Sequence, residues 1–327
     1  MTDSAGSSPS IRRARASADG TQWKPQIAIV TITKDDAAGI RKTIASVEQQ
    51  DFSEYEHVVV DGGSRTDIAD WLGLWRDADA HRHILVEDPP DGIYPSMNTG
   101  IENTTAPIIL ILNGGDQLLP GALRRVSEHY KVHGWRWAYG GTESREPDGR
   151  FEGRLTRTRF SRHKFRAGLH LVPHLSAFVT RDLYRELGLY RVDLGTGADQ
   201  EFFLRASRVA EPGLLPGILS VFELGGVSQQ VGIIRREIDW HRMRVASNTA
   251  FGGYPATDLI VTALLLAYQV FRAIARKVRA VIGHPFAHRR ASRAWKTAKS
   301  GMRGFEYYTA RIGFRSCRIR KSQPPTD

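Results

Sequence analysis

Two short polar clusters carry carboxylates, of which one could accept hydrogen bonds from a base or a ribose and the other could hold a divalent cation. Asp61 begins Asp61-Gly62-Gly63-Ser64, and Asp116 ends Asn113-Gly114-Gly115-Asp116. A divalent cation such as Mg²⁺ or Mn²⁺ binds through one or two carboxylates plus substrate phosphates, and glycines allow a backbone to approach a ligand closely. The structural alternative for each Asp, read singly, is a turn that ends a strand.

Three further positions could hold or move a proton, or bind a ligand. Asp199 lies in Asp199-Gln200-Glu201-Phe202-Phe203 at the start of a helical stretch, where the helix macrodipole also favours acids. Asp91-Gly92-Ile93-Tyr94 is followed by Met97-Asn98-Thr99-Gly100, an arrangement that is unusual for a plain loop. His174 lies among apolar residues, and a single buried histidine is more often structural than catalytic.

The elements that must position these clusters alternate between strand-like and helical patterns. Strand-like runs over Gln26–Thr33, His57–Val60 and Ile108–Leu112 are separated by helical stretches, which favours parallel βαβ units. Polar groups at the carboxyl ends of such strands meet at one sheet edge, where open α/β sheets bind nucleotides. We therefore expect an α/β fold whose central sheet is mostly parallel and is flanked by helices.

Weaker patterns continue this alternation along the chain. Residues 140–168 are rich in Arg and are expected to form either an antiparallel excursion or a mobile loop. We expect further helices over residues 40–49, 68–75, 121–133, 182–187 and 198–208, and further strands over residues 84–87, 137–139 and 214–224.

Composition divides the chain into three parts. Residues 1–24 have almost no large apolar side chain and are expected to be disordered, residues 25–230 form the main domain, and residues 231–327 form a helical, basic extension. From Gln269 onward there are 15 Lys and Arg but 2 acidic residues, a net charge of +13, so the rest sums to −2 within the total of +11. Such a tail can meet nucleic acid or an anionic membrane surface, whereas the near-neutral body is not a basic nucleic-acid platform.

The apolar segment Leu259–Ile274 has the spacing of an amphipathic helix. Its core is short for a transmembrane helix and is interrupted by Gln269. One face, with basic residues clustered near its end, comprises Ile260, Leu264, Tyr268, Phe271 and Ala275. The pattern favours an interfacial helix over anionic lipid, and the alternative is a C-terminal helix packed on the domain with a solvated basic end.

Several classes of protein are excluded by what the sequence lacks. Cys317 is the single cysteine, which excludes a disulfide framework and a cysteine-based zinc site and fits a reducing cytoplasm. No apolar segment follows Arg12–Arg15, so we expect no secretory signal. The motifs of P-loop NTPases, Rossmann dehydrogenases, serine hydrolases of the G-x-S-x-G type and HExxH metalloproteases are missing.

Taken together and in order, these pieces resemble the family 2 glycosyltransferases of the GT-A fold, and most of all the bacterial branch that builds extracellular polysaccharides and glycolipids. The resemblance covers roughly residues 25–230. The matching stretches, none of them specific alone, are Ile29–Lys34, Val58–Ser64, Asp91–Tyr94 with Met97–Ile101, Leu112–Asp116, His174–Phe178, Ala198–Phe202 and Gly225–Ser228.

On the donor side, the resemblance implies roles for five residues. Thr31, Thr33 and Asp61 would line the pocket for the nucleoside, with Asp61 bonded to the base. Asp91 and Asn98 would lie near the nucleotide or the sugar.

The resemblance also implies the groups that perform the reaction. Asp116 would match the last Asp of the family's D-x-D motif and bind Mn²⁺ or Mg²⁺ on the diphosphate, Asp199 would match the catalytic base, and His174 would lie on the acceptor side. The motif keeps only its final acid, because Asn113-Gly114-Gly115 precedes it.

The function implied by the resemblance is transfer of a sugar from a nucleotide-diphosphate donor to a hydroxyl of a glycan or lipid-linked acceptor, with inversion, in cell-envelope polysaccharide or glycolipid synthesis. The place of action would be the cytoplasmic face of the plasma membrane, and no nucleic acid would be bound. Two alternatives stay open: a nucleotidyltransferase that makes sugar nucleotides, and a non-enzymatic nucleic-acid or membrane-binding protein that acts through its basic tail.

Overall fold

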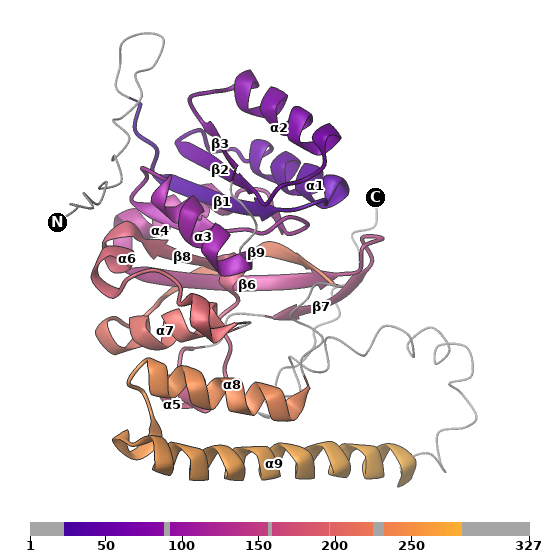
Figure 1. Ribbon diagram of the computed structural model, residues 1–327, viewed down its shortest axis with the longest axis vertical. Coiled ribbons are helices and arrows are strands. Elements are labelled where there is room, and N and C mark those ends of the chain that lie inside the picture. Colours follow the sequence, from indigo (N-terminus) through magenta and orange to yellow (C-terminus); the bar gives the residue numbers. More distant parts are fainter. Residues whose placement is uncertain (1–22, 88–91, 156–158, 196, 225–231, 283–327) are drawn as a thin grey trace, which may run out of the picture.

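The computed structural model describes residues 23–87, 92–155, 159–195, 197–224 and 232–282 (Figure 1). Most of the N-terminal tail, Asp91, the motif Gly225–Ser228 and the basic tail beyond residue 282 lie outside these described residues, so the predictions made for them stay predictions.

The N-terminal half of the sheet is parallel and has the order β3-β2-β1-β4. Its strands are β1 (Ile27–Thr33), β2 (Tyr55–Asp61), β3 (His83–Glu87) and β4 (Ile108–Ile111), and the connecting helices are α1 (Ala37–Glu48), α2 (Thr66–Ala78) and α3 (Ile93–Glu102). The chain moves outward from β1 to β3 and then returns to the other side of β1. This reversal leaves a crevice position at the carboxyl ends of β1 and β4.

The second half of the sheet mixes strand directions and continues as β8-β6-β9-β5, with β7 paired to β6. The strands are β5 (Gln117–Leu118), β6 (Trp137–Arg145), β7 (Phe151–Leu155), β8 (Ala177–Thr180) and β9 (Gly213–Glu223). β8 runs antiparallel to both β4 and β6, whereas β9 is parallel to β6. One continuous sheet therefore joins the two halves of the domain.

Helices cover the sheet and extend the molecule at one end (Figure 1). They are α4 (Ala122–His133), α5 (Arg162–Arg166), α6 (Arg181–Leu187), α7 (Ala198–Val209), α8 (Ile233–Ala246) and α9 (Pro255–Ile282). α8 lies against α7, and α9 forms the outermost layer beyond α8, at the opposite end of the molecule from α2 (Figure 1).

The largest part of the core lies where α3 and α7 meet the sheet. Val30, Val60 and Met97 share a buried cluster with Phe202 and Trp240, and the last of these comes from α8. The C-terminal extension is thus packed into the core of the domain through α8. The proposed boundary at residue 230 falls between β9 and α8, among residues that the structure does not describe.

The expected α/β architecture, with a central sheet, flanking helices and a C-terminal helix, is confirmed. The sheet is mixed rather than mostly parallel, because four of its strand pairings are parallel and four are antiparallel. Residues 140–155 form the antiparallel excursion rather than a loop, because β6 continues to Arg145 and β7 returns beside it. The sequence analysis did not foresee the helix α3 or the strand β8.

Candidate active site

The carboxyl ends of β1 and β2 place Thr33 beside Asp61. Asp61 is buried and closes a turn, because its carboxylate accepts hydrogen bonds from the amide of Ser64 at 3.2 Å and from the Ser64 hydroxyl at 2.5 Å. The Thr33 hydroxyl is buried and has no hydrogen-bond partner among the described residues. An unsatisfied buried hydroxyl beside a buried carboxylate is a natural contact point for a polar ligand.

Thr31 lies deeper in the sheet than the pocket role would suggest. Its side chain is fully buried, and its hydroxyl lies 2.9 Å from Nε2 of His57. Burial, and to a smaller extent the neighbouring His83, lowers the pKa of His57 to about 3, so this ring is neutral. The position of Thr31 therefore supports a structural pair inside the sheet, and its contact with a nucleoside stays a prediction.

The loop after β4 is fixed between β1 and α1. The amide of Gly114 donates to the carbonyl of Ile32 at 3.0 Å, and the amide of Gly115 donates to the Thr43 hydroxyl at 3.0 Å. Gly115 has φ +94°, a conformation that favours glycine. Thr43 in turn donates to the carbonyl of Asp116 at 2.7 Å. These bonds hold the polar loop at the same edge as Thr33.

Asp116 is a buried carboxylate with no compensating cation among the residues that the structure describes. Its Oδ1 accepts a 3.3 Å hydrogen bond from the amide of Glu223, at the end of β9. Burial raises the pKa of Asp116 to about 8; the Glu223 amide opposes this effect and the Glu223 carboxylate adds to it. The side chain of Glu223 pairs with Lys42 at 2.7 Å. Two carboxylates thus lie near one another where the loop meets β9.

Asp199, the second residue of α7, is held by two donors. The hydroxyl of Tyr94, from α3, donates to Oδ1 at 3.0 Å, and Nε2 of Gln200 donates to Oδ2 at 2.8 Å. Burial, and next the carboxylate of Asp199, raises the pKa of Tyr94 above its ordinary value, so the phenol stays protonated and remains a donor. The orientation of the carboxylate is therefore fixed from both sides.

His174 connects Asp199 to the loop after β4. Its Nδ1 lies 4.0 Å from Oδ2 of Asp199, and its Nε2 lies 3.4 Å from Nδ2 of Asn113. Burial lowers the pKa of His174, and the Asp199 carboxylate opposes this effect. Oδ1 of Asn113 is buried without a partner among the described residues. It is the second unsatisfied polar atom at this edge.

Asn98 has a different place from the one suggested by its motif. Its side chain donates to the carbonyl of Tyr190 at 2.9 Å and accepts from the amide of Tyr190 at 3.0 Å. The amide group therefore clamps α3 to the segment before α7, and contact with the donor stays a prediction for Asn98.

The edge thus brings together most of the predicted site residues. Thr33 and Asp61 adjoin the loop that carries Asp116, and His174 joins that loop to Asp199. Sequence reasoning did not select Tyr94, Asn113 or Gln200 as site residues. Each lies inside a motif that the analysis quoted, but only the fold shows which side chain it contacts.

Comparison with known proteins identifies the family of the chain. The family model described as "Glycosyl transferase family 2" matches residues 28–184. An uncharacterised glycosyltransferase of Mycobacterium tuberculosis is 32% identical over 229 residues, which cover 67% of this chain and 85% of the relative. The chain belongs to glycosyl transferase family 2. This membership makes it a glycosyltransferase and favours that function over the two alternatives.

Other relatives and solved structures extend the similarity. A glycosyltransferase named for PGL/p-HBAD biosynthesis, from Mycobacterium bovis BCG, is 27% identical over 216 residues, covering 63% of this chain and 80% of its own. Among solved structures, residues 1–349 of S. aureus TarS in complex with UDP match with a TM-score of 0.56 and 15% identity, over 74% of this chain and 70% of that one. A mannosyltransferase of Pyrobaculum calidifontis in complex with GDP-Man and Mn²⁺ matches with a TM-score of 0.52 and 16% identity, over 84% of each chain. These likenesses show the GT-A fold.

Proposed function

We propose that this glycosyltransferase moves a sugar from a nucleotide-diphosphate donor to an acceptor hydroxyl, with inversion at the anomeric carbon. The observation that carries the proposal is the connected edge of polar side chains that runs from Asp61 through the loop of Asp116 to His174 and Asp199. Such an edge can hold both ends of an activated sugar, because the nucleoside, the diphosphate and the acceptor each need different polar partners.

On the donor side, the nucleoside would lie over the ends of β1 and β2. The hydroxyl of Thr33 and the buried carboxylate of Asp61 are suited to its polar groups. Within the described part of the chain, neither that hydroxyl nor the side-chain oxygen of Asn113 has a hydrogen-bond partner. Similar folds in solved structures hold UDP or GDP-Man, which supports a nucleotide-sugar donor. Thr31, Asp91 and Asn98 belong to the same proposal through their family motifs.

Asp116 would hold a divalent cation, Mn²⁺ or Mg²⁺, together with the donor diphosphate. The fit rests on a buried carboxylate without a compensating cation among the described residues and on the nearby carboxylate of Glu223. Carboxylate oxygens plus substrate phosphates are the ligands that these cations take. A bound cation would neutralise the negative charge that builds on the departing diphosphate.

Asp199 would act as the general base. It takes the proton of the acceptor hydroxyl while the oxygen of that hydroxyl forms a bond to the anomeric carbon, and the bond from this carbon to the diphosphate breaks. Tyr94 and Gln200 aim the carboxylate, and His174 lies on the acceptor side. A single base with direct displacement gives inversion.

The acceptor would be a glycolipid or lipid-linked glycan of the cell envelope, met at the cytoplasmic face of the plasma membrane. The relative named for PGL/p-HBAD biosynthesis supports an envelope role, and the apolar helix α9 supports work at a membrane surface.

A screen of nucleotide sugars by thermal shift, with and without Mn²⁺, tests the donor proposal. We expect one nucleotide sugar to raise the melting temperature and Mn²⁺ to increase that shift. In Asp116→Asn, the part of the shift in melting temperature that depends on Mn²⁺ should disappear. A substitution of the exposed Asp67, Asp67→Asn, should behave as wild type. Turnover should then release nucleoside diphosphate. Release of pyrophosphate from a nucleoside triphosphate would instead favour a nucleotidyltransferase and contradict the proposal.

A further inference from the structure

A helix that packs on a soluble domain is expected to bury its apolar face and to expose its polar face. The helix α9 does the opposite. Among the side chains of α9 that the structure describes, up to residue 275, the two buried ones are the polar Asp258 and Thr262, and half-buried Gln269 lies on the same face. These three positions share a face because they are spaced by four and seven residues. The polar face of α9 therefore points into the protein, and its apolar face points outward.

The polar face is fastened to α8 along its length. Arg244 donates to both carboxylate oxygens of Asp258, at 2.8 and 2.9 Å, and to the hydroxyl of Thr262 at 2.6 Å. Further along, Gln269 donates to Glu237 at 2.8 Å. Because both arginine and aspartate of the first contact are fully buried, α9 is held firmly against α8.

The outward face of α9 is a continuous apolar surface. Three of its large side chains are more than three-fifths exposed: Ile260 at 63%, Leu264 at 65% and Phe271 at 69%. Exposed Leu259, Tyr268, Val270 and Ile274 extend the surface. An apolar patch of this extent on a soluble protein marks an interaction site.

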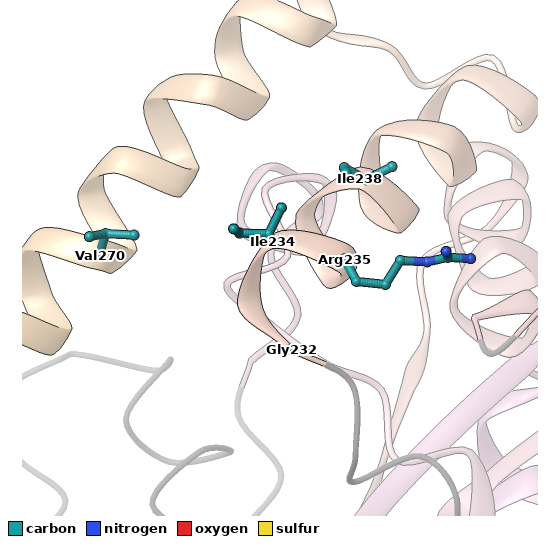
Figure 2. Close-up of a pocket in the computed structure, with 5 residues that line it drawn as sticks. All are labelled: Gly232, Ile234, Arg235, Ile238 and Val270. Atoms are coloured by element: carbon teal, nitrogen blue, oxygen red, sulfur yellow. The ribbon is translucent and has the colours of Figure 1, made fainter.

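The apolar surface continues from α9 onto α8. An open groove of about 640 Å³ between the two helices is lined by Gly232, Ile234, Arg235, Ile238 and Val270 (Figure 2). Ile234 and Ile238, one turn apart on α8, are 63% and 47% exposed. The two helices thus present one joint apolar face.

We propose that the hairpin of α8 and α9 is a monotopic membrane anchor that lies in the plane of a bilayer with anionic lipid. The apolar face of both helices would enter the boundary between headgroups and acyl chains. Charge complementarity favours anionic lipid as the partner of this face, because from Gln269 to the C-terminus the sequence has 15 Lys and Arg but 2 acidic residues. A strongly basic segment that begins in the C-terminal part of an exposed apolar helix and continues beyond it fits an anionic lipid surface.

The packing of α9 distinguishes an in-plane anchor from a transmembrane helix. Pro255–Ala275 is, within the described part of the chain, the one helix long and apolar enough to cross a membrane. Crossing would expose Asp258 and Gln269 to the lipid core, or would draw in α8 with its charged residues Arg244 and Glu237. An in-plane helix keeps every one of these contacts.

The anchor also lies one helix away from the base of the proposed reaction. On α8, Met243 packs against Gly197, the residue that caps α7 immediately before Ala198 and Asp199; a Cβ at Gly197 would lie 2.8 Å from the Met243 sulfur. Only this consequence rests on the proposed function: the acceptor hydroxyl would be taken from a molecule held at the bilayer surface. Binding of the anchor to lipid does not depend on it.

Vesicle flotation of the full chain tests the anchor without any sugar donor. Ile260→Ser, Leu264→Ser and Phe271→Ser are combined in one variant. The matched control combines Val132→Ser, Leu74→Ser and Phe151→Ser, which are exposed apolar residues on α4, α2 and β7. We expect the first variant to lose at least tenfold in partition to vesicles of equal phosphatidylcholine and phosphatidylglycerol. The control should partition as wild type, and both variants should keep the wild-type melting temperature.

Two results of this experiment would overturn the proposal. The first is undiminished flotation of the folded α9 variant. The second is a wild-type dimer in lipid-free solution that the α9 substitutions dissociate while flotation is unchanged, because the apolar face would then belong to a second copy of the chain. A failure to find any nucleotide sugar would leave these measurements unaffected.

The single cysteine, Cys317, follows α9 in the sequence and reports the side of the membrane on which the tail lies. In inside-out membrane vesicles from cells that express the full chain, an impermeant maleimide should label Cys317 as fully as it does after detergent is added. Labelling that appears only after detergent would place the tail in the lumen and would contradict an in-plane anchor.

Discussion

At the scale of single residues, the site depends on how one carboxylate is oriented. Asp199 accepts one hydrogen bond from α3, through Tyr94, and one from its own helix, through Gln200. Hydrogen bonds to a charged group contribute about 1.5–3 kcal/mol each, so either donor can decide the direction in which this carboxylate, the proposed base, points.

Replacing Tyr94 by Phe should therefore slow the reaction without weakening donor binding. We expect kcat to fall about tenfold to a hundredfold, because the loss of one charged hydrogen bond corresponds to about 1.5–3 kcal/mol. The KM for the donor should stay within about twofold, since the proposed base would act on the acceptor. Steady-state kinetics with a soluble acceptor analogue measure both constants.

The matched control for this variant is Tyr130→Phe, in which the tyrosine lies on α4 and packs against Trp135. It should leave both constants unchanged. An increase in KM with an unchanged kcat in Tyr94→Phe would show that Tyr94 binds substrate and does not orient the base.

Residue contacts of this kind could not be read from the sequence. The motifs around Asp61 and Asp116 predicted that polar groups would gather at one sheet edge, because the carboxyl ends of parallel strands meet there, and the structure brings these two motifs together. Tyr94 and Asp199, in contrast, are 105 positions apart, and only the fold brings the N-terminal ends of α3 and α7 within hydrogen-bond distance. Thr31 illustrates the opposite case, since its motif suggested a pocket and its side chain lies inside the sheet.

At the scale of elements, two residues of α3 explain why this helix was not predicted, and one of them is also required for its close packing on the sheet. Its sequence contains Pro95 and Gly100, which lower intrinsic helix propensity. Pro95 is tolerated because it lies in the first turn. Gly100 is required because α3 lies directly on β1 and β2.

The strand β8 was missed for a simpler reason, since its four residues Ala177–Thr180 are too few to show a period.

A methyl group at Gly100 should destabilise the fold. A Cβ there would lie 2.3 Å from Cγ1 of Val30 and 3.1 Å from Cγ2 of Val60. Overpacking of this kind costs about 1–3 kcal/mol, so Gly100→Ala should lower the free energy of unfolding by about that amount. Urea denaturation followed by circular dichroism measures it.

Gly73, on α2, is the matched control because a Cβ there meets nothing within 4 Å. Gly73→Ala should leave stability unchanged or raise it by up to about 1 kcal/mol, since alanine favours a helix. Equal effects of the two substitutions would show that α3 does not pack on the sheet as closely as described.

At the scale of the whole molecule, His57 and His170 are two buried histidines that are held in the neutral form. Burial lowers the pKa of His57 to about 3 and that of His170 to about 4. Both pKa values are below the ordinary value of 6.5. Between pH 6.5 and the folded-state pKa values, the unfolded chain therefore binds more protons than the folded chain. The contribution of these two histidines to the free energy of unfolding is complete above pH 6.5. It is lost as the pH falls toward their pKa values in the folded state.

The free energy of unfolding should therefore decrease in mild acid. Each histidine adds a slope of about 1.4 kcal/mol per pH unit below its unfolded pKa. Urea denaturation at a series of pH values measures the slope. His57→Gln should reduce it by about one histidine's share, and the exposed His81→Gln should not change it. A slope that is the same in His57→Gln as in wild type would contradict a neutral, buried His57.

The packing of the C-terminal extension on the domain is also a property of the whole molecule. The sequence pattern identified the apolar positions Ile260, Leu264, Tyr268 and Phe271 of α9, and the structure places all four on the exposed face. The pattern could not show that Asp258 and Thr262 are the buried side, because their burial depends on Arg244 of α8. The proposed catalytic edge and the apolar hairpin thus lie in one packed unit joined through α7 and α8.

The most direct test of the central claim compares donor binding with sugar transfer in Asp199→Asn. The edge from Asp61 to Asp116 should still bind the nucleotide sugar with a Kd within about threefold of wild type. Transfer should fall by about 10²–10⁴-fold, which is the usual contribution of a general base. The exposed Asp182→Asn should match wild type in both measurements. Turnover of Asp199→Asn near the wild-type rate, with donor binding intact, would contradict the account.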